Sequence, residues 1–190
     1  MAVPLPVTEA VAPLAPLAPP PDETTWNMLA TAIALAAAAG SLWLSLGMGL
    51  QACPLCYYQR SFVFGAAAVL LTAQLTEFRD SAVVSLLAMP LAAAGLSVAC
   101  FHVSREVLGK MECPLGLLGL GTAPQQSLAI QLLLVLTLGV AARRRPVAVV
   151  GVLLGGLLAY ACIISAAMPP KPSPADYEQP PIICRPVQSV

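Results

Sequence analysis

The sequence contains few charged residues and no excess of either sign. Only 9% of its 190 residues are Asp, Glu, Lys or Arg, whereas a soluble domain carries about 25% and needs them to cover its surface. Nine basic residues balance nine acidic ones, so the chain lacks the positive charge that binds a nucleic acid backbone. A hydrophobic fraction of 58% is typical of a membrane protein. We therefore expect an all-α integral membrane protein whose surroundings are lipid and whose partners include no nucleic acid.

Charged residues are also missing from five long stretches of the chain. A bilayer-spanning helix needs about 20 apolar residues, and only a helix satisfies its own backbone in hydrocarbon. The second stretch begins after Arg60 and is short, so the span predicted there starts before it and has Arg60 just inside the expected membrane boundary. The five predicted spans, which place the two termini on opposite sides of the membrane, are 27–50, 55–76, 81–102, 125–142 and 147–168.

The distribution of basic residues predicts an orientation. Arg143, Arg144 and Arg145 form a dense cluster in the short loop between the fourth and fifth expected spans, and such loops lie in the cytoplasm. Residues 1–25 are rich in Pro and Ala, which favours extended, solvated chain. They also lack the basic start of a secretory signal. We expect this segment to be a disordered cytoplasmic tail.

Cysteine is the residue type most suited to chemistry in this chain. The six cysteines are Cys53, Cys56, Cys100, Cys113, Cys162 and Cys184. In the orientation above, all except Cys100 and Cys162 lie on the outer side, where disulfides form and persist. Those two lie inside expected spans, and we interpret them as inert small hydrophobic residues. Charge and cysteine placement thus predict the same orientation.

Cys53 and Cys56 form a C-x-x-C pair at the expected start of the second span. Unpaired N–H groups and the helix dipole stabilise a thiolate at such a position, as redox cycling requires. Arg60 follows Cys56 by four residues and therefore lies on the same helix face, where a thiolate or a polar ligand group could partner it. Spacing alone leaves a zinc half-site or a structural disulfide equally open.

The segment from Cys53 to Arg60, in which Tyr57-Tyr58-Gln59 follows the C-x-x-C pair, resembles the disulfide bond formation protein B (DsbB) family. His102, at the outer end of the third expected span, is a second similarity. The resemblance covers about residues 42–140, without the N-terminal tail and the fifth span.

For the architecture, the resemblance implies a four-helix transmembrane bundle, here over residues 26–145. The chain adds a fifth C-terminal span at 146–168 and an extracytoplasmic tail at 169–190, which carries Cys184. The resemblance also implies the inner (cytoplasmic) membrane of a bacterium, with the redox cysteines on the extracytoplasmic side.

For the activity, the resemblance implies a protein that oxidises a DsbA-like thioredoxin-fold partner and passes two electrons to a quinone, ubiquinone or menaquinone. Cys56 would engage the quinone ring, and Cys53 would be its exchange partner. Arg60 and His102 would hold the quinone oxygens and stabilise charge as the ring is reduced.

The chain departs from the family at its second cysteine pair. The family usually places both of these cysteines between spans three and four, but here that loop contains only Cys113. Taken with the resemblance, the natural partner is Cys184, and the pair would be the disulfide that meets the partner protein. The Pro and Gly residues around both cysteines favour a mobile bridge. Pairing with Cys100 or Cys162 stays open, because connectivity does not follow from sequence.

Two alternatives belong to other functional classes or families. Cys53, Cys56, Met111 and His102 could hold a soft ion such as Cu(I) in a non-catalytic metal binder, although Cys113 and Cys184 would then be unused. A vitamin K epoxide reductase-type thiol enzyme is the second alternative. That family has its C-x-x-C pair after the loop cysteines, so the order of cysteines here favours the DsbB interpretation.

Overall fold

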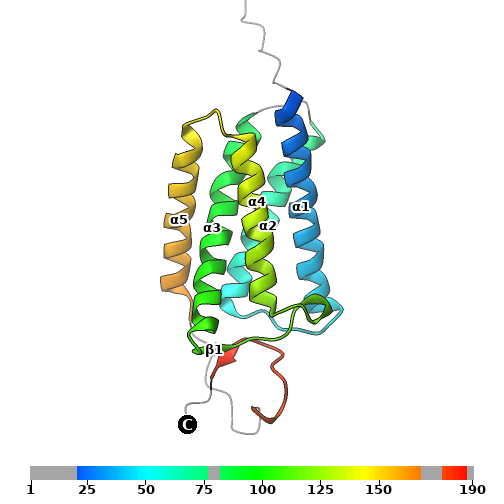
Figure 1. The fold of residues 1–190 in the computed structure, drawn as a ribbon, viewed down its shortest axis with the longest axis vertical. Helices are drawn as coiled ribbons and strands as arrows, with labels where there is room; N and C mark the ends of the chain where they lie inside the picture. The colour runs from blue at the N-terminus through cyan, green and yellow to red at the C-terminus, as the bar shows by residue number, and fades with distance from the viewer. Residues whose placement is uncertain (1–20, 77–81, 168–176, 188–190) are drawn as a thin grey trace, which may run out of the picture.

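The regular structure of this protein is almost entirely helical (Figure 1). The computed structural model describes residues 21–76, 82–167 and 177–187. The long helices in these ranges are α1 (Pro21–Leu46), α2 (Pro54–Gln74), α3 (Ala82–Val107), α4 (Ala123–Ala141) and α5 (Val147–Ser165). The short elements are the 3-10 helix η2 (Leu117–Gly119) and the two-residue strands β1 (Met111–Glu112) and β2 (Arg185–Pro186). Consecutive long helices run in opposite directions, so alternate connections lie at the same end (Figure 1).

Each predicted span coincides with one long helix, but the helices differ in composition. Four segments are long and apolar enough to cross a membrane: Glu23–Leu46, Val83–Val107, Ala123–Ala141 and Val147–Ser165. This makes the chain a multi-pass membrane protein. Helix α2 is not among these four, because Gln59, Arg60 and Gln74 lower its hydropathy. Whether α2 also spans the membrane stays a prediction.

The first helix is shifted toward the N-terminus relative to its predicted range. Residues 21–25, assigned to the disordered tail, are the first residues of α1, and a proline at the first helical position loses no hydrogen bond. The helix ends at Leu46 rather than at residue 50, because the chain turns and Gly49 adopts a φ of 68°. Residues 1–20 of the expected tail lie outside the described residues.

The third helix is longer than its predicted range. It continues five residues beyond position 102, to Val107, and the chain then turns at Gly109 with a φ of 65°. His102 is therefore not at the helix end. It lies more than a turn inside α3, where its side chain is enclosed by the bundle.

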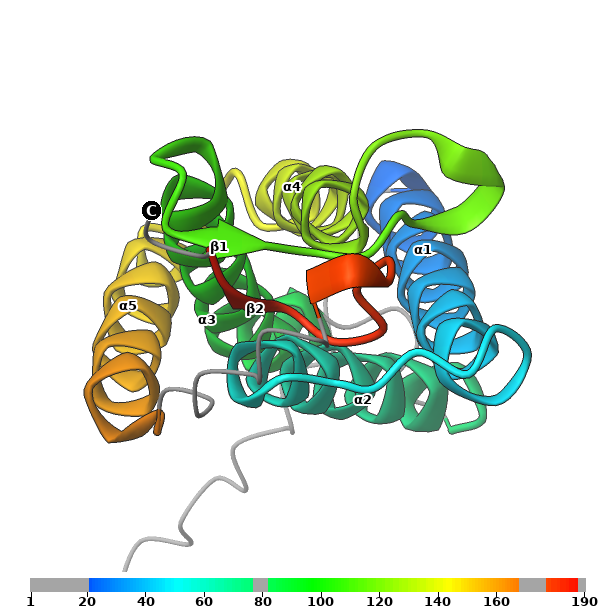
Figure 2. The same ribbon diagram turned by 90° about the horizontal axis from the view of Figure 1, so that it is seen from below.

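Four helices form a bundle, and the fifth lies on its outside (Figure 2). Helix α1 packs on α2 and α4, while α3 packs on α2, α4 and α5. Close approach of α5 to α3 requires Gly155, because a Cβ atom there would lie 2.5 Å from the Pro90 carbonyl oxygen. Small residues at helix contacts allow such packing in membranes.

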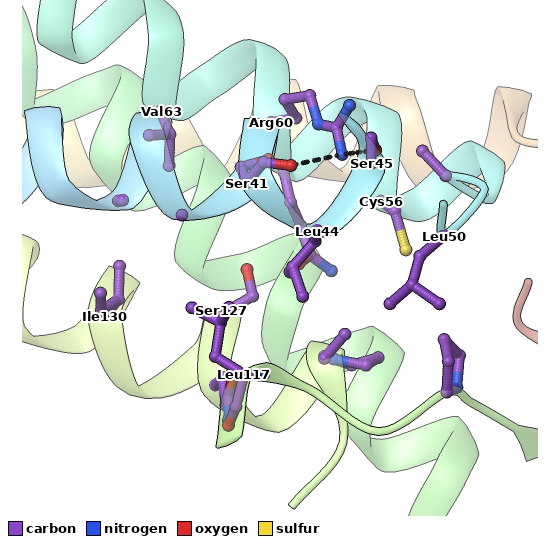
Figure 3. Close-up of a pocket in the computed structure, with 18 of the residues that line it drawn as sticks. Ser41, Leu44, Ser45, Leu50, Cys56, Arg60, Val63, Leu117, Ser127 and Ile130 are labelled. Carbon is purple, nitrogen blue, oxygen red and sulfur yellow. Dashed lines mark hydrogen bonds between the residues drawn. The ribbon is translucent and has the colours of Figure 1, made fainter. Parts of the chain in front are cut away.

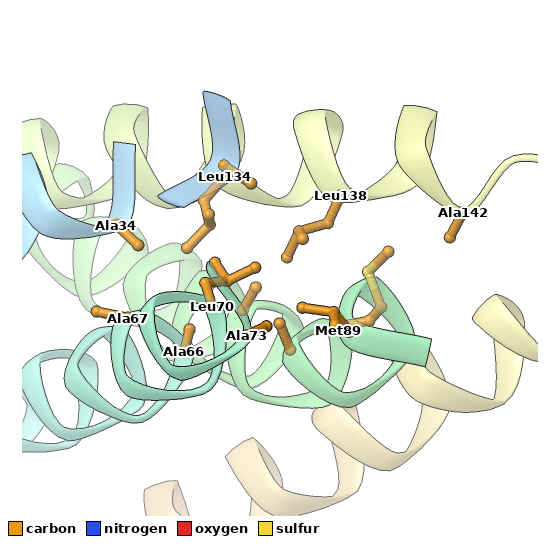
Figure 4. Packing of buried hydrophobic residues seen from close by; sticks show 13 residues of the cluster. Ala34, Ala66, Ala67, Leu70, Ala73, Met89, Leu134, Leu138 and Ala142 are labelled. Atoms are coloured by element: carbon orange, nitrogen blue, oxygen red, sulfur yellow. The ribbon is translucent and has the colours of Figure 1, made fainter. Parts of the chain in front are cut away.

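The interior of the bundle divides into two halves along its axis. One half is mainly apolar and combines large side chains such as Leu70, Met89, Leu134 and Leu138 with many alanines (Figure 4). Its buried polar groups include Ser85, which donates to the Asn27 amide oxygen at 2.6 Å. The other half, where α2 and α4 begin and α3 and α5 end, buries Cys53, Cys113 and Cys184 among apolar neighbours. The candidate site lies in this second half.

Candidate redox site

The N-terminus of α2 positions the C-x-x-C pair. Cys53 is the N-cap residue, and its Sγ accepts a hydrogen bond from the Cys56 backbone N–H at 3.3 Å. Pro54 is the first helical residue, where its missing N–H has no consequence. The two Sγ atoms lie 2.9 Å apart, within reach of a shared proton in the reduced pair and of a disulfide bond when oxidised.

The surroundings of Cys53 favour its thiolate. The pKa of this thiol is lowered to about 5, first by the hydrogen bond with the Cys56 thiol and further by the hydrogen bond with His102, against the opposing effect of burial. A reduced pair therefore holds a thiolate at neutral pH. Since the thiolate is the species that attacks disulfides, this is the state that thiol exchange needs.

His102 lies between the two cysteine pairs. Its ring is fully buried, and Nε2 is 3.9 Å from the Cys53 Sγ and 3.6 Å from the Cys113 Sγ. On the other side of the ring, Nδ1 is 3.1 Å from Nε2 of Gln59. An amide N–H donated to Nδ1 leaves the ring hydrogen of the neutral histidine on Nε2, where it faces the sulfurs.

Two buried glutamines support this arrangement, and the sequence analysis assigned neither of them a role. The Gln131 amide donates to the backbone carbonyl of Gln59 at 3.3 Å. Gly95 makes room for Gln131, since a Cβ atom at position 95 would lie 2.5 Å from its amide nitrogen. The available signal was the presence of amides in otherwise apolar helices, because such side chains are costly in a membrane unless they are hydrogen-bonded.

The second cysteine pair joins the C-terminal segment to the loop after α3. Cys113 and Cys184 form a disulfide, which is the pairing expected from the sequence. β1 pairs antiparallel with β2 beside this bond. The Arg185 Nε is 3.1 Å from a carboxylate oxygen of Glu112, and its guanidinium stacks 4.7 Å from the ring centre of Tyr177. The C-terminal segment therefore lies fastened across the cysteine end of the bundle (Figure 2).

This disulfide is buried, contrary to the expected mobile bridge. Only 7% of Cys113 and 2% of Cys184 is exposed. The reason is the pairing of β1 with β2 and the ion pair beside it, which the Pro and Gly content of the two segments does not reveal. In this conformation Cys53 and Cys56 lie next to the disulfide bond, whereas a protein outside the bundle cannot contact it.

The sulfur atoms and the imidazole form one cluster. The Sγ atoms of Cys53, Cys56 and Cys184 and a ring nitrogen of His102 all lie within 4.8 Å of one another. A reduced set of this composition could ligate a metal ion. The disulfide takes Cys184 out of such a set and instead places two redox pairs in contact.

A cleft also borders the C-x-x-C pair, between α1, α2 and α4, and Cys56 and Cys184 are both among its lining residues. It encloses about 950 Å³ of space, part of it open to the surroundings, and its walls are mainly apolar. Figure 3 shows the Cys56 sulfur facing this space near Leu50. Arg60 lines the same cleft and donates to the Ser41 carbonyl at 3.0 Å and to the Ser45 hydroxyl at 2.7 Å.

The residues predicted to contact a quinone are separated in the structure. Arg60 lines the cleft, but His102 is not among the lining residues and lies beside Cys53 and Cys113 instead. The remaining cysteines form no disulfide. Cys100 is exposed on α3 and Cys162 is half-buried on α5, so the burial assumed for Cys100 in the sequence analysis is wrong. The alternative pairings with Cys113 do not occur.

Comparison with known proteins identifies the family. A family model described as "Disulfide bond formation protein DsbB" matches residues 23–167. The chain belongs to the DsbB family. Searches of curated proteins and of solved structures gave no match.

The extent of the DsbB match corrects one expectation. It reaches from the first turn of α1 to beyond the end of α5, so the fifth helix lies within the family match rather than outside it. Membership in the DsbB family makes the chain a membrane disulfide oxidoreductase. The two adjacent cysteine pairs are the groups in the described residues that suit this chemistry.

Proposed function

We propose that this DsbB-family protein takes two electrons from a soluble DsbA-like thioredoxin-fold dithiol protein and passes them to a membrane quinone. The observation that supports this most directly is the position of the C-x-x-C pair. One of its cysteines contacts a second disulfide through the shared sulfur cluster, and the other faces an apolar cleft. A pair so placed can receive electrons through Cys53 and release them through Cys56.

The cleft suits the head group of a quinone. A flat apolar ring with carbonyl oxygens needs mainly apolar walls and a few polar groups that fix its orientation. The buried Nε of Arg60 has no hydrogen-bond partner within the described residues, so the arginine retains a donor that a ligand oxygen could satisfy. Cys56 and Arg60 would hold the ring, and ubiquinone and menaquinone both meet these requirements. When bound, the quinone supplies the two-electron acceptor.

The protein's own groups then have distinct roles. One thiolate of the partner attacks the Cys113–Cys184 disulfide and forms a mixed disulfide, which the partner's second thiol then displaces. The partner leaves with its own disulfide formed, and Cys113 and Cys184, here called the loop pair, are left reduced. Exchange with Cys53 moves the electrons to the C-x-x-C pair. The N-terminus of α2 stabilises negative charge there, and the Arg60 guanidinium stabilises negative charge beside Cys56. Because the outer disulfide is buried, the partner reaches it only after the β1–β2 contact has opened.

We place the cysteine end on the extracytoplasmic side of a bacterial inner membrane, with the Arg143–Arg145 loop in the cytoplasm. This agrees with the positive-inside tendency and with disulfide chemistry outside the cell. We also propose that α2 is a fifth span. It lies between α1 and α3 in the bundle, and Gln59 is directed to the interior, only 4% exposed. Its polar groups are thereby kept from lipid.

The test is anaerobic addition of a reduced thioredoxin-fold protein to the purified full-length chain with ubiquinone or menaquinone. Quinone absorbance and free thiols are followed together. The proposal expects one quinol for each partner disulfide formed. Oxidation of the partner without quinol, or no oxidation at all, would contradict it. The Cys100→Ser variant is a matched control, because this cysteine is free and exposed on the outside of α3.

A further inference from the structure

We propose that His102 catalyses the transfer of electrons between the two cysteine pairs, by donating its Nε2 hydrogen to both the attacking and the leaving sulfur. This inference rests on the proposed function, of which the internal exchange is one step. It assigns the histidine to the disulfide side of the site rather than to the quinone.

Three sulfur atoms, those of Cys113, Cys184 and Cys53, lie in a row along the path of exchange, and His102 lies beside the first and the last. The Cys184 Sγ is bonded to Cys113 and lies within 4.8 Å of the Cys53 Sγ. The imidazole Nε2 is 3.6 Å from the first terminal sulfur, that of Cys113, and 3.9 Å from the other, that of Cys53. Cys184 is thus the sulfur that can be transferred between Cys113 and Cys53.

The exchange runs in two displacements that balance. The Cys184 thiolate first attacks Cys53 in the oxidised C-x-x-C pair, and the Cys53–Cys56 bond breaks with Cys56 leaving as a thiolate. The Cys113 thiolate then attacks Cys184, and the new Cys53–Cys184 bond breaks with Cys53 leaving as a thiolate. Two electrons have moved to the C-x-x-C pair. Of the two protons lost by the loop thiols, one is held by this pair and one passes to water.

The second displacement is the step that His102 serves. Negative charge moves from the attacking Cys113 sulfur to the departing Cys53 sulfur, and both ends carry charge in the transition state. A hydrogen bond to a charged acceptor is about twice as strong as one between neutral groups. A fixed donor that reaches both sulfurs therefore lowers the barrier more than it stabilises the disulfides themselves.

The surroundings of the ring fix this donor in place. Gln59 holds Nδ1, so the ring hydrogen stays on Nε2, and the Gln131 amide holds the backbone of Gln59. His102 itself is completely buried, so solvent does not compete with the imidazole for the sulfurs. Because the ring does not line the cleft, its removal acts on the exchange and not on the quinone.

The first experiment isolates the exchange. Fully oxidised, quinone-free protein receives one equivalent of a reduced thioredoxin-fold protein and is quenched with acid at successive times. Alkylation and peptide mapping then count the free thiols of each pair. In His102→Ala we expect transfer from the loop pair to the C-x-x-C pair to slow by about tenfold or more. His102→Gln, which keeps an N–H donor, should lie between this variant and the natural protein.

The second experiment isolates the quinone step. A Cys113→Ser/Cys184→Ser protein receives dithiothreitol as electron donor, and quinol formation is followed with and without His102→Ala. We expect the two rates to agree within about twofold. Equal slowing in both experiments would assign the histidine to the quinone, and no slowing in the first would remove it from the exchange. Either result overturns the proposal.

Two controls keep the outcome interpretable. Ser104→Ala lies on the same helix, where its hydroxyl bonds only to the Phe101 carbonyl in the described structure, and should transfer electrons at the natural rate. Failure of the natural protein to form a reduced C-x-x-C pair would instead contradict the proposed function. The two failures are therefore distinguishable.

Discussion

The C-x-x-C pair meets two environments that differ in openness and in their polar groups, the cleft at Cys56 and the buried disulfide near Cys53. The cleft side is open and apolar, with Arg60 as its cation. The disulfide side is closed, with His102, its partner Gln59 and the Cys113–Cys184 bond buried together, although Gln59 and Cys184 also line the cleft. An apolar cleft can bind a flat hydrophobic acceptor, whereas thiolate exchange gains from fixed donors in a site without water. The difference suits the proposed path, in which electrons enter from the disulfide through Cys53 and leave through Cys56 into the cleft.

Loss of Cys56 gives the largest expected effect, because this cysteine is the group that joins the two sides. Cys56→Ser should abolish quinone reduction, since the sulfur that faces the cleft is gone. Cys53→Ser should also stop turnover, because the loop pair then has no disulfide to reduce. Quinone absorbance under anaerobic conditions measures both. Sustained turnover in either variant would show that the C-x-x-C pair is not the redox centre.

Arg60 tests the cleft side separately. Arg60→Ala should raise the apparent KM for quinone about 10- to 100-fold, the equivalent of one lost hydrogen bond from a charged donor. Arg60→Lys should recover only part of this, because an ammonium lacks the planar fork of donors. The rate of exchange between the two cysteine pairs is the internal control and should not change. An unaltered quinone dependence in Arg60→Ala would remove the arginine from the binding site.

The position of each long helix could be predicted from the sequence, because uncharged apolar runs directly encode membrane-compatible segments. The position of Cys53 at a helix N-terminus could also be predicted, since a proline follows it and proline favours the first helical position. The length of α3 was not, because no proline or glycine marks the expected end at position 102. The helix ends only near Gly109.

The contacts of His102 with Gln59 and with the cysteines could not be predicted from the sequence. Its neighbours come from α2 and from the loop after α3, so their contacts depend on how the helices are rotated against one another. The burial of the outer disulfide likewise depends on the pairing of β1 with β2, two short strands far apart in the chain. Resemblance to a family supplied the residue types but not these contacts.

A pH titration sharpens the comparison on the disulfide side. With the pKa of Cys53 at about 5, the reduced C-x-x-C pair holds one proton above that pH and two below it. Reduction takes up these protons, so the potential should fall by about 30 mV per pH unit above pH 5 and by about 60 mV below it. Redox titration against a dithiol buffer measures the slope. His102→Ala should move the change of slope to higher pH, since the histidine helps to lower this pKa; a slope of about 60 mV persisting to pH 8 in the natural protein would contradict the thiolate.

The smallest expected effect concerns access to the outer disulfide. The Glu112–Arg185 ion pair joins β1 to β2, and the carboxylate side chain is 46% exposed, so its loss should weaken the closed state by no more than about 1 kcal/mol. Glu112→Gln should therefore speed attack of a reduced thioredoxin-fold protein on the Cys113–Cys184 bond by up to about fivefold. Acid quenching and alkylation of the loop thiols measure this rate.

The matched control for Glu112→Gln is Glu178→Gln, which removes one negative charge from the C-terminal segment but leaves the Glu112–Arg185 pair intact. In Glu178→Gln, the rate at which a reduced thioredoxin-fold protein reduces the Cys113–Cys184 disulfide should equal that of the natural protein. If Glu112→Gln also left that rate unchanged, opening of the strand pair would not limit access. If Glu112→Gln lowered the rate, the Glu112 carboxylate would act by contacting the partner rather than by holding β1 and β2 together. The two variants thus distinguish two routes to the buried disulfide. In one, the partner gains access when the β1–β2 contact opens, and in the other it first binds the surface that includes Glu112.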